Sequence, residues 1–167
     1  MSSAANPDPS VLDSERFPVL DLLKPPISCR INSEGFPEVL DFLRKKWIQL
    51  TPEEWVRQHV LYWLINQTGY PLHLLAVERG ITLKTLRTDV LGFDREGKSL
   101  LLVECKAARV PINEAVMFQA INYNQSLKAR FIWLSSGISH QVMELDREGN
   151  FLRQHSILPH FSEMLKD

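Results

Sequence analysis

The sequence has few of the features that mark secreted or membrane proteins. Its 167 residues include only two cysteines, Cys29 and Cys105, which are too few and too far apart for a disulfide framework. No apolar run approaches the length that spans a bilayer, and residues 1–10 lack the basic and then apolar pattern of a signal peptide. These absences predict a cytoplasmic protein with no membrane partner.

An excess of charge of one sign is also missing. The 19 Lys and Arg residues nearly balance the 20 Asp and Glu residues, so that the net charge is −1. This balance argues against a protein that coats nucleic acid indiscriminately, although it is compatible with a local basic patch. The sequence contains no internal repeat and no Gly-x-x-x-x-Gly-Lys phosphate loop. Its length and its 44% hydrophobic residues fit one domain with a substantial core.

The pattern of apolar residues predicts an α/β domain. Thr51, Pro52 and Glu54 are typical of a helix start, and the apolar positions continue to about Gln67. Residues 99–106 contain an unbroken apolar stretch, which indicates a buried, central strand. The remaining elements are expected as strands at 74–78, 85–93 and 130–135, a helix at 113–127, a hairpin of strands at 142–145 and 151–155, and a short helix at 159–165.

This order predicts four segments along the chain. Residues 1–26 are expected to form a loosely ordered tail, although their apolar side chains could lie across a neighbouring surface. Residues 27–50 are an N-terminal β extension with a turn at Ser33–Gly35. Residues 51–147 form the core, a mixed central β-sheet flanked by helices in the order αβββαβ. Residues 148–167 are a C-terminal extension packed on that core.

A charged pair at the end of the central strand needs an explanation. Alternation along a strand places Glu104 and Lys106 on one face and Cys105 on the other. Charges beside a buried strand are costly unless they are paired or bind an ion. Cys105, which faces away from the charges, is therefore interpreted as a packing residue and not as a nucleophile.

The preceding hairpin brings another acid to this place. If the chain turns around Glu96–Gly97 with Asp94 opposite Ser99, the same count places Asp89 opposite Glu104. Directly opposed acids repel one another, so their pairing makes sense if a divalent cation binds between them. Oxygen ligands without His or Cys favour Mg²⁺ or Mn²⁺ over zinc.

These residues together predict phosphodiester hydrolysis. A metal bound by Asp89 and Glu104 would polarise a phosphodiester oxygen and activate a water molecule. Lys106 would orient that water or help to deprotonate it, and would stabilise the growing negative charge. A Glu-x-Lys triplet alone is common by chance. Its position at the end of a buried strand, opposite an aspartate, is what favours a functional site.

Four segments closely resemble the N-terminal nuclease domain of type I restriction enzyme R subunits: residues 51–58, 87–90, 101–107 and 119–124. The resemblance extends over about residues 51–137. It implies the PD-(D/E)xK restriction-endonuclease-like fold, a magnesium-dependent reaction on DNA, and the family's aspartate, glutamate and lysine roles for Asp89, Glu104 and Lys106.

The resemblance also implies roles for residues around this centre. Gln119 and Tyr123 match a Gln-x-x-x-Tyr signature on the following helix, and Gln119 is a further catalytic candidate while Tyr123 would contact substrate. Glu54 matches a catalytic or metal-binding glutamate of many relatives, although a capping box explains it equally well. Glu78 competes with Glu54 for this role. Candidates for substrate binding also include Arg57 and Arg87, and for Arg57 a structural ion pair is the alternative.

The leading hypothesis is therefore a divalent-metal-dependent endonuclease acting on DNA. The alternative is a non-catalytic nucleic-acid-binding or assembly subunit that retains the nuclease fold. A homodimer and contacts with other restriction or helicase subunits are both compatible with the sequence. Restriction R subunits continue into a helicase-like motor, whereas no motor phosphate loop occurs in these 167 residues. That difference leaves the role in a restriction complex open.

Overall fold

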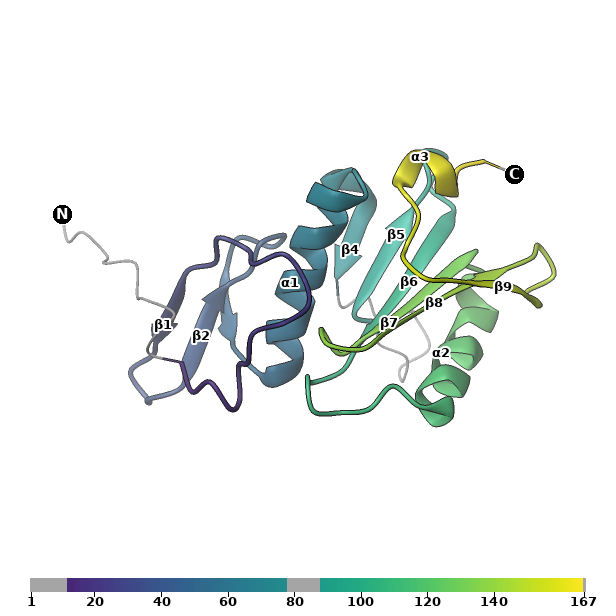
Figure 1. The fold of residues 1–167 in the computed structure, drawn as a ribbon. Coiled ribbons are helices and arrows are strands. Elements are labelled where there is room, and N and C mark those ends of the chain that lie inside the picture. The colour runs from purple at the N-terminus through teal and green to yellow at the C-terminus, as the bar shows by residue number, and fades with distance from the viewer. Residues whose placement is uncertain (1–11, 78–87, 167) are drawn as a thin grey trace.

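The structure, a computed structural model, describes residues 12–77 and 88–166. Figure 1 shows two β-sheets on either side of a long helix, with a second long helix on the far side of the larger sheet. The predicted residues Glu78 and Arg87 lie outside the described part of the chain. None of the helices in the described ranges is long and apolar enough to cross a membrane.

The smaller sheet is antiparallel and is built from the N-terminal β extension. Its strands are β1 (Cys29–Ile31), β2 (Pro37–Leu40) and β3 (Trp47–Gln49), in that order. The turn between β1 and β2 lies where it is predicted. The side chain of Asn32 accepts hydrogen bonds from the backbone N–H groups of Glu34 and Phe36, and Gly35 takes a positive φ of 84°.

Helix α1 (Pro52–Gln67) begins at the predicted residue. The hydroxyl of Thr51 accepts a hydrogen bond from the backbone N–H of Glu54 at 3.1 Å, which satisfies one of the free donors at the helix start. Val56, Val60 and Leu64 are completely buried. The helix lies between the two sheets and contributes side chains to their shared core.

The larger sheet has six strands, in the order β4-β5-β6-β7-β8-β9. All neighbouring pairs are antiparallel except β6 and β7, which are parallel and are joined by α2 (Glu114–Leu127). This is the predicted mixed α/β sheet with flanking helices. Its strands are β4 (Leu75–Val77), β5 (Val90–Phe93), β6 (Ser99–Cys105), β7 (Phe131–Ser135), β8 (His140–Leu145) and β9 (Phe151–His155), and two short helices are η2 (Leu72–Leu74) and α3 (Phe161–Met164).

Alternate residues of β6 face two different cores. Leu101 and Val103 belong to the core shared with α1 and the N-terminal sheet, whereas Leu102 belongs to the core shared with Ala120 of α2. Since both faces are covered, every residue of β6 after Ser99 is buried, as its unbroken apolar stretch predicts.

Residues 12–26 of the N-terminal tail pack on the core through their apolar side chains. These residues form no helix or strand, yet Phe17 and Leu20 are each only 7% exposed and belong to the core next to α1. The indole N–H of Trp55 donates to the backbone carbonyl of Pro18 at 2.9 Å. The apolar residues of this segment therefore anchor it, because their burial outweighs the disorder that its polar composition favours.

The hairpin of β5 and β6 corrects one predicted pairing and keeps another. Ser99 pairs with Phe93, so that the expected pairing of Ser99 with Asp94 is wrong. A β-bulge then leaves Leu100 without a partner, and Val103 pairs with Val90. The bulge restores the register that the sequence count assumed, and Asp89 and Glu104 follow as the next opposed positions.

Candidate active site

Asp89, Glu104 and Lys106 come together where β5 begins and β6 ends. A carboxylate oxygen of Asp89 accepts a hydrogen bond from the backbone N–H of Cys105 at 2.7 Å. Nζ of Lys106 donates to Oε1 of Glu104 at 3.1 Å. The backbone N–H of Lys106 donates to the carbonyl of Ser135 at 2.8 Å, so that the neighbouring strand β7 fixes the end of β6.

The pKa values of both acids in this cluster are raised, chiefly because their side chains are buried. Burial, and then the charge of Asp89, raise the pKa of Glu104 to about 7. Burial also raises the pKa of Asp89, although the N–H of Cys105 and the charge of Arg57 oppose that rise. Burial alone would lower the pKa of Lys106, but the charge and hydrogen bond of Glu104 raise it. Lys106 is therefore a cation at neutral pH.

The donor set fits a hard divalent cation. Oε2 of Glu104 is buried and has no hydrogen-bond partner among residues 12–77 and 88–166, which is costly for a carboxylate unless something else binds it. Within residues 12–77 and 88–166, no group of three or more His, Cys, Asp and Glu side chains could hold a metal ion. Mg²⁺ commonly takes one or two carboxylates and completes its shell with water and substrate phosphate, so that two acids suffice for it.

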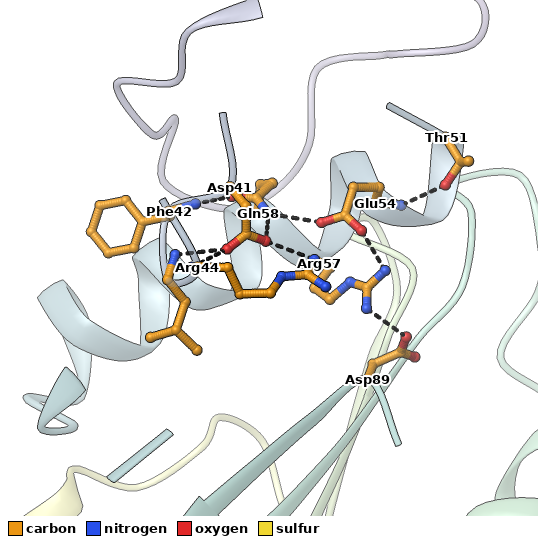
Figure 2. A network of polar contacts seen from close by, with 9 residues as sticks. Asp41, Phe42, Arg44, Thr51, Glu54, Arg57, Gln58 and Asp89 are labelled. Atoms are coloured by element: carbon orange, nitrogen blue, oxygen red, sulfur yellow. Dashed lines mark hydrogen bonds and ion pairs between the residues drawn. The ribbon is translucent and has the colours of Figure 1, made fainter. Parts of the chain in front are cut away.

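Glu54 and Arg57 lie beside this cluster on the first two turns of α1 (Figure 2). The carboxylate of Glu54 accepts hydrogen bonds from the guanidinium of Arg57 and, at 2.7 Å, from the amide of Gln58. Its oxygens are used in these contacts and not in a capping box. Nη1 of Arg57 also lies 3.8 Å from Oδ1 of Asp89. Arg57 thus joins Glu54 to the site, because among the described residues no hydrogen bond runs directly from Glu54 to Asp89.

Asp41 and Gln58 complete this network, and sequence reasoning missed both of them. The amide of Gln58 donates to Oδ2 of Asp41 at 3.0 Å and to Glu54, which places it between two carboxylates. Asp41 is completely buried and follows β2 in the N-terminal sheet. Gln58 lies four residues after Glu54, a helical spacing that could have indicated contact. No sequence pattern indicated the role of Asp41, because Asp41 follows a strand of the separate N-terminal sheet.

Glu53 is a third residue that sequence reasoning missed. It is exposed in the first turn of α1, and its charge is among the causes that raise the pKa of Asp89, Glu104 and Lys106. Of the two adjacent glutamates, Glu53 is exposed and its charge acts on the three site residues, whereas Glu54 is buried against Arg57 and Gln58. An acidic pair in the first turn is also typical of any helix start, which is why the sequence did not single out Glu53.

Gln119 is exposed on α2, Tyr123 is half-buried against the core beneath this helix, and the two side chains contact one another. The amide of Gln119 donates to the hydroxyl of Tyr123 at 2.9 Å. In the described part of the chain, neither side chain makes a hydrogen bond to Asp89, Glu104 or Lys106. The structure therefore brings these two residues together, but it does not join them to the acids.

A second buried carboxylate, Glu144, lies at the opposite end of the same sheet, where β8 pairs with the start of β7. Its oxygens accept hydrogen bonds or ion pairs from Arg130 at 2.8 Å, Arg153 at 2.9 Å and His155 at 2.6 Å. Burial alone would raise its pKa, but these partners lower it below the ordinary value. Glu144 is thus fully paired.

Comparison with known proteins identifies the family of this chain. No curated protein matches the chain. The pattern of the family described as type I restriction enzyme R protein N terminus (HSDR_N) matches residues 52–159. This range contains Glu54, Asp89, Glu104 and Lys106 and makes up more than half of the 167 residues. The chain therefore belongs to the type I restriction enzyme R protein N-terminal family.

Proposed function

We propose that this chain is a divalent-metal-dependent nuclease that hydrolyses phosphodiester bonds in DNA, with a site of the PD-(D/E)xK type. The observation that carries the proposal is Glu104, whose buried Oε2 has no hydrogen-bond partner in the part of the chain that the structure describes, although Asp89 and Lys106 lie beside it. A purely structural strand end would pair both oxygens. The restriction enzyme family to which the chain belongs supports DNA as the substrate.

Asp89 and Glu104 would hold the cation, which is Mg²⁺ or Mn²⁺. When bound, such an ion supplies Lewis-acid polarisation of a phosphate oxygen and lowers the pKa of a water ligand. Asp89 has one oxygen tied to the N–H of Cys105, which orients its carboxylate and leaves Oδ1 turned toward Arg57. Glu104 has Oε1 tied to Lys106 and Oε2 unpartnered. Each acid therefore has one anchored oxygen and one that remains for a ligand.

Lys106 contributes positive charge and hydrogen bonds. Because Glu104 raises its pKa, Lys106 is protonated at neutral pH and donates to water or to a phosphate oxygen. In the reaction, a water oxygen forms a bond to phosphorus, the bond from phosphorus to the leaving oxygen breaks, and the water proton passes to solvent or to the leaving group. Lys106 would orient the attacking water and stabilise the charge that grows on the phosphate oxygens.

The test is cleavage of plasmid and single-stranded DNA with Mg²⁺ or Mn²⁺ by wild-type protein and by Lys106→Ala. We expect Lys106→Ala to lose cleavage while it keeps metal affinity, because a protonated lysine is not a metal ligand. Lys98→Ala is the matched control, since Lys98 is exposed on the hairpin turn and pairs with the exposed Glu96. Equal rates for wild type and Lys106→Ala would show that the activity comes from elsewhere.

A second measurement separates binding from catalysis. Calorimetric titration with Mn²⁺ should show binding to wild type and a loss of binding in Asp89→Ala and in Glu104→Ala. Both variants should fold, because removal of one opposed acid relieves repulsion. Absence of cation binding by wild-type protein at millimolar Mg²⁺ and Mn²⁺ would overturn the metal-dependent mechanism and favour a non-catalytic DNA-binding subunit.

A further inference from the structure

The turn after β2 is joined to the candidate active site although it lies outside residues 52–159, which match the family pattern. Asp41 organises this turn. One of its oxygens accepts hydrogen bonds from the backbone N–H groups of Leu43, at 3.0 Å, and of Arg44. Its other oxygen accepts from the guanidinium of Arg44 at 2.9 Å and from Gln58 at 3.0 Å. Asp41 is therefore a rigid attachment point for helix α1.

The side-chain amide of Gln58 links Asp41 to Glu54 and is held in one orientation. Its side-chain oxygen accepts a hydrogen bond from the backbone N–H of Phe42 at 3.0 Å, so that its nitrogen must point the other way. That nitrogen donates to both Asp41 and Glu54. Gln58 is completely buried, and each end of its amide has a partner (Figure 2). The amide therefore holds the carboxylate of Glu54 in one position.

Glu54 in turn competes with Asp89 for the guanidinium of Arg57. Arg57 is in hydrogen-bond contact with Glu54, whereas its Nη1 is 3.8 Å from Oδ1 of Asp89, beyond hydrogen-bond distance. All three side chains are largely buried, since Glu54 and Arg57 are 4% and 8% exposed and Asp89 is 22% exposed. A small movement of Arg57 would close a full ion pair with Asp89 and place a positive charge on the oxygen that remains for a ligand.

We propose that the N-terminal sheet keeps Arg57 on Glu54 through Gln58, and thereby keeps Asp89 open to a divalent cation. Asp41, Gln58 and Glu54 are then positioning residues of the site, and the N-terminal sheet is part of the functional unit. The inference rests on the proposed function, because the ligand of Asp89 is the cation of that proposal. It adds that metal affinity depends on residues that do not bind the metal.

The test measures Mn²⁺ affinity by calorimetry in wild type, in Gln58→Leu and in the double variant Gln58→Leu with Arg57→Leu. Gln58→Leu removes the donor that fixes Glu54, so that Arg57 can close on Asp89. We expect its Mn²⁺ affinity to fall about tenfold or more, as a charge-assisted contact on a ligand oxygen implies. The double variant should recover an affinity near that of wild type, because no guanidinium remains to occupy Asp89.

The recovery distinguishes positioning from a merely structural role. If Gln58 only stabilised the fold, replacing Arg57 as well would remove a second buried polar residue and weaken Mn²⁺ binding further. Gln67→Leu, on the exposed last turn of the same helix, is the matched control and should bind Mn²⁺ like wild type. Should Gln58→Leu fail to fold, Glu54→Gln carries the same test, because it keeps the shape and loses the charge that holds Arg57.

The outcomes separate this inference from the proposed function. Mn²⁺ binding by wild type that is unchanged in folded Gln58→Leu and Glu54→Gln overturns the positioning role and leaves the metal site standing. Weaker binding in Gln58→Leu without recovery in the double variant also overturns it. If wild type binds no cation and cleaves no DNA, the proposed function fails, and this inference fails with it.

Discussion

Two buried glutamates in one sheet, Glu104 and Glu144, have opposite surroundings. Glu144 is 2% exposed and is bound by three basic side chains, which lower its pKa. Glu104 is 7% exposed and its pKa is raised to about 7. Among the described residues, Lys106 is its ion-pair partner and one of its oxygens has no hydrogen-bond partner. The fold can thus satisfy a buried carboxylate where it stabilises the sheet. At the other end of the sheet it leaves one carboxylate oxygen unsatisfied, which supports the proposed metal site at Glu104.

The largest expected effect is on cleavage by Glu104→Gln. The amide keeps the size of the side chain but removes its negative charge, which attracts a cation and repels Asp89. We expect DNA cleavage to fall roughly 10²- to 10³-fold, with no loss of thermal stability. Cleavage assays and thermal melting measure the two quantities. A variant that cleaves like wild type would show that the unsatisfied glutamate is not functional.

The matched change, Glu144→Gln, should affect stability instead. It leaves Arg130, Arg153 and His155 facing a neutral group, and breaking a buried ion pair by removal of one partner costs about 3 kcal/mol. Urea unfolding should show this loss, while Mn²⁺ affinity of the folded protein stays unchanged. Loss of metal affinity without loss of stability would contradict the division between the two glutamates.

In metal-free protein, Glu104 and Glu144 should make the free energy of unfolding depend on pH in opposite directions. The folded pKa of Glu104 is raised, so that its contribution is present below the ordinary value near 4.5 and is lost as the pH rises to about 7, by about 2 to 3 kcal/mol. The folded pKa of Glu144 is lowered, so that its contribution is present above the ordinary value and is lost as the pH falls below it.

Urea unfolding of wild type, Glu104→Gln and Glu144→Gln between pH 4 and pH 8 measures both dependences. The loss between pH 4.5 and pH 7 should vanish in Glu104→Gln, and millimolar Mg²⁺ should reduce it in wild type. An unchanged slope in Glu104→Gln would assign the loss to another group, of which Asp89 is the first to examine.

The smallest expected effect concerns Gln119. If its position on α2 serves to orient Lys106 or a phosphate once substrate is bound, Gln119→Ala should reduce cleavage about tenfold and leave stability within about 0.5 kcal/mol, since the side chain is exposed. Gln125→Ala, exposed on the same helix, is the control and should cleave like wild type. Equal rates for both variants would restrict the site to the strand ends and α1.

Much of the fold follows from local patterns in the sequence. The start of α1 at Pro52 and the cap of α2 at Asn113 are confirmed, because a capping side chain acts within three residues of its own position. The place of β6 follows from its apolar stretch. The pairing near Asp94 is wrong because a bulge at Leu100 depends on turn geometry that residue counting does not contain.

The site was less predictable where it depends on contacts between distant segments. The nearness of Asp89 and Glu104 follows from a hairpin count, since the two strands are consecutive. The link from Asp41 to Gln58 joins two elements that no periodicity relates, and the burial of Leu20 against the core likewise depends on tertiary packing. The roles of Asp89, Glu104 and Lys106 remain predictions that the experiments above test.

The parallel pairing of β6 with β7 has a consequence for how the site assembles in time. Val90 and Val103 are close in the chain, so that the β5–β6 hairpin can form within microseconds. Cys105 meets Ser135 only after the intervening loop and α2 have ordered, and that long-range closure is slow. We therefore expect the two acids to meet before the backbone of Lys106 is anchored to β7. Folding of this end of the sheet begins with repulsion, and a divalent cation in the refolding buffer should accelerate it.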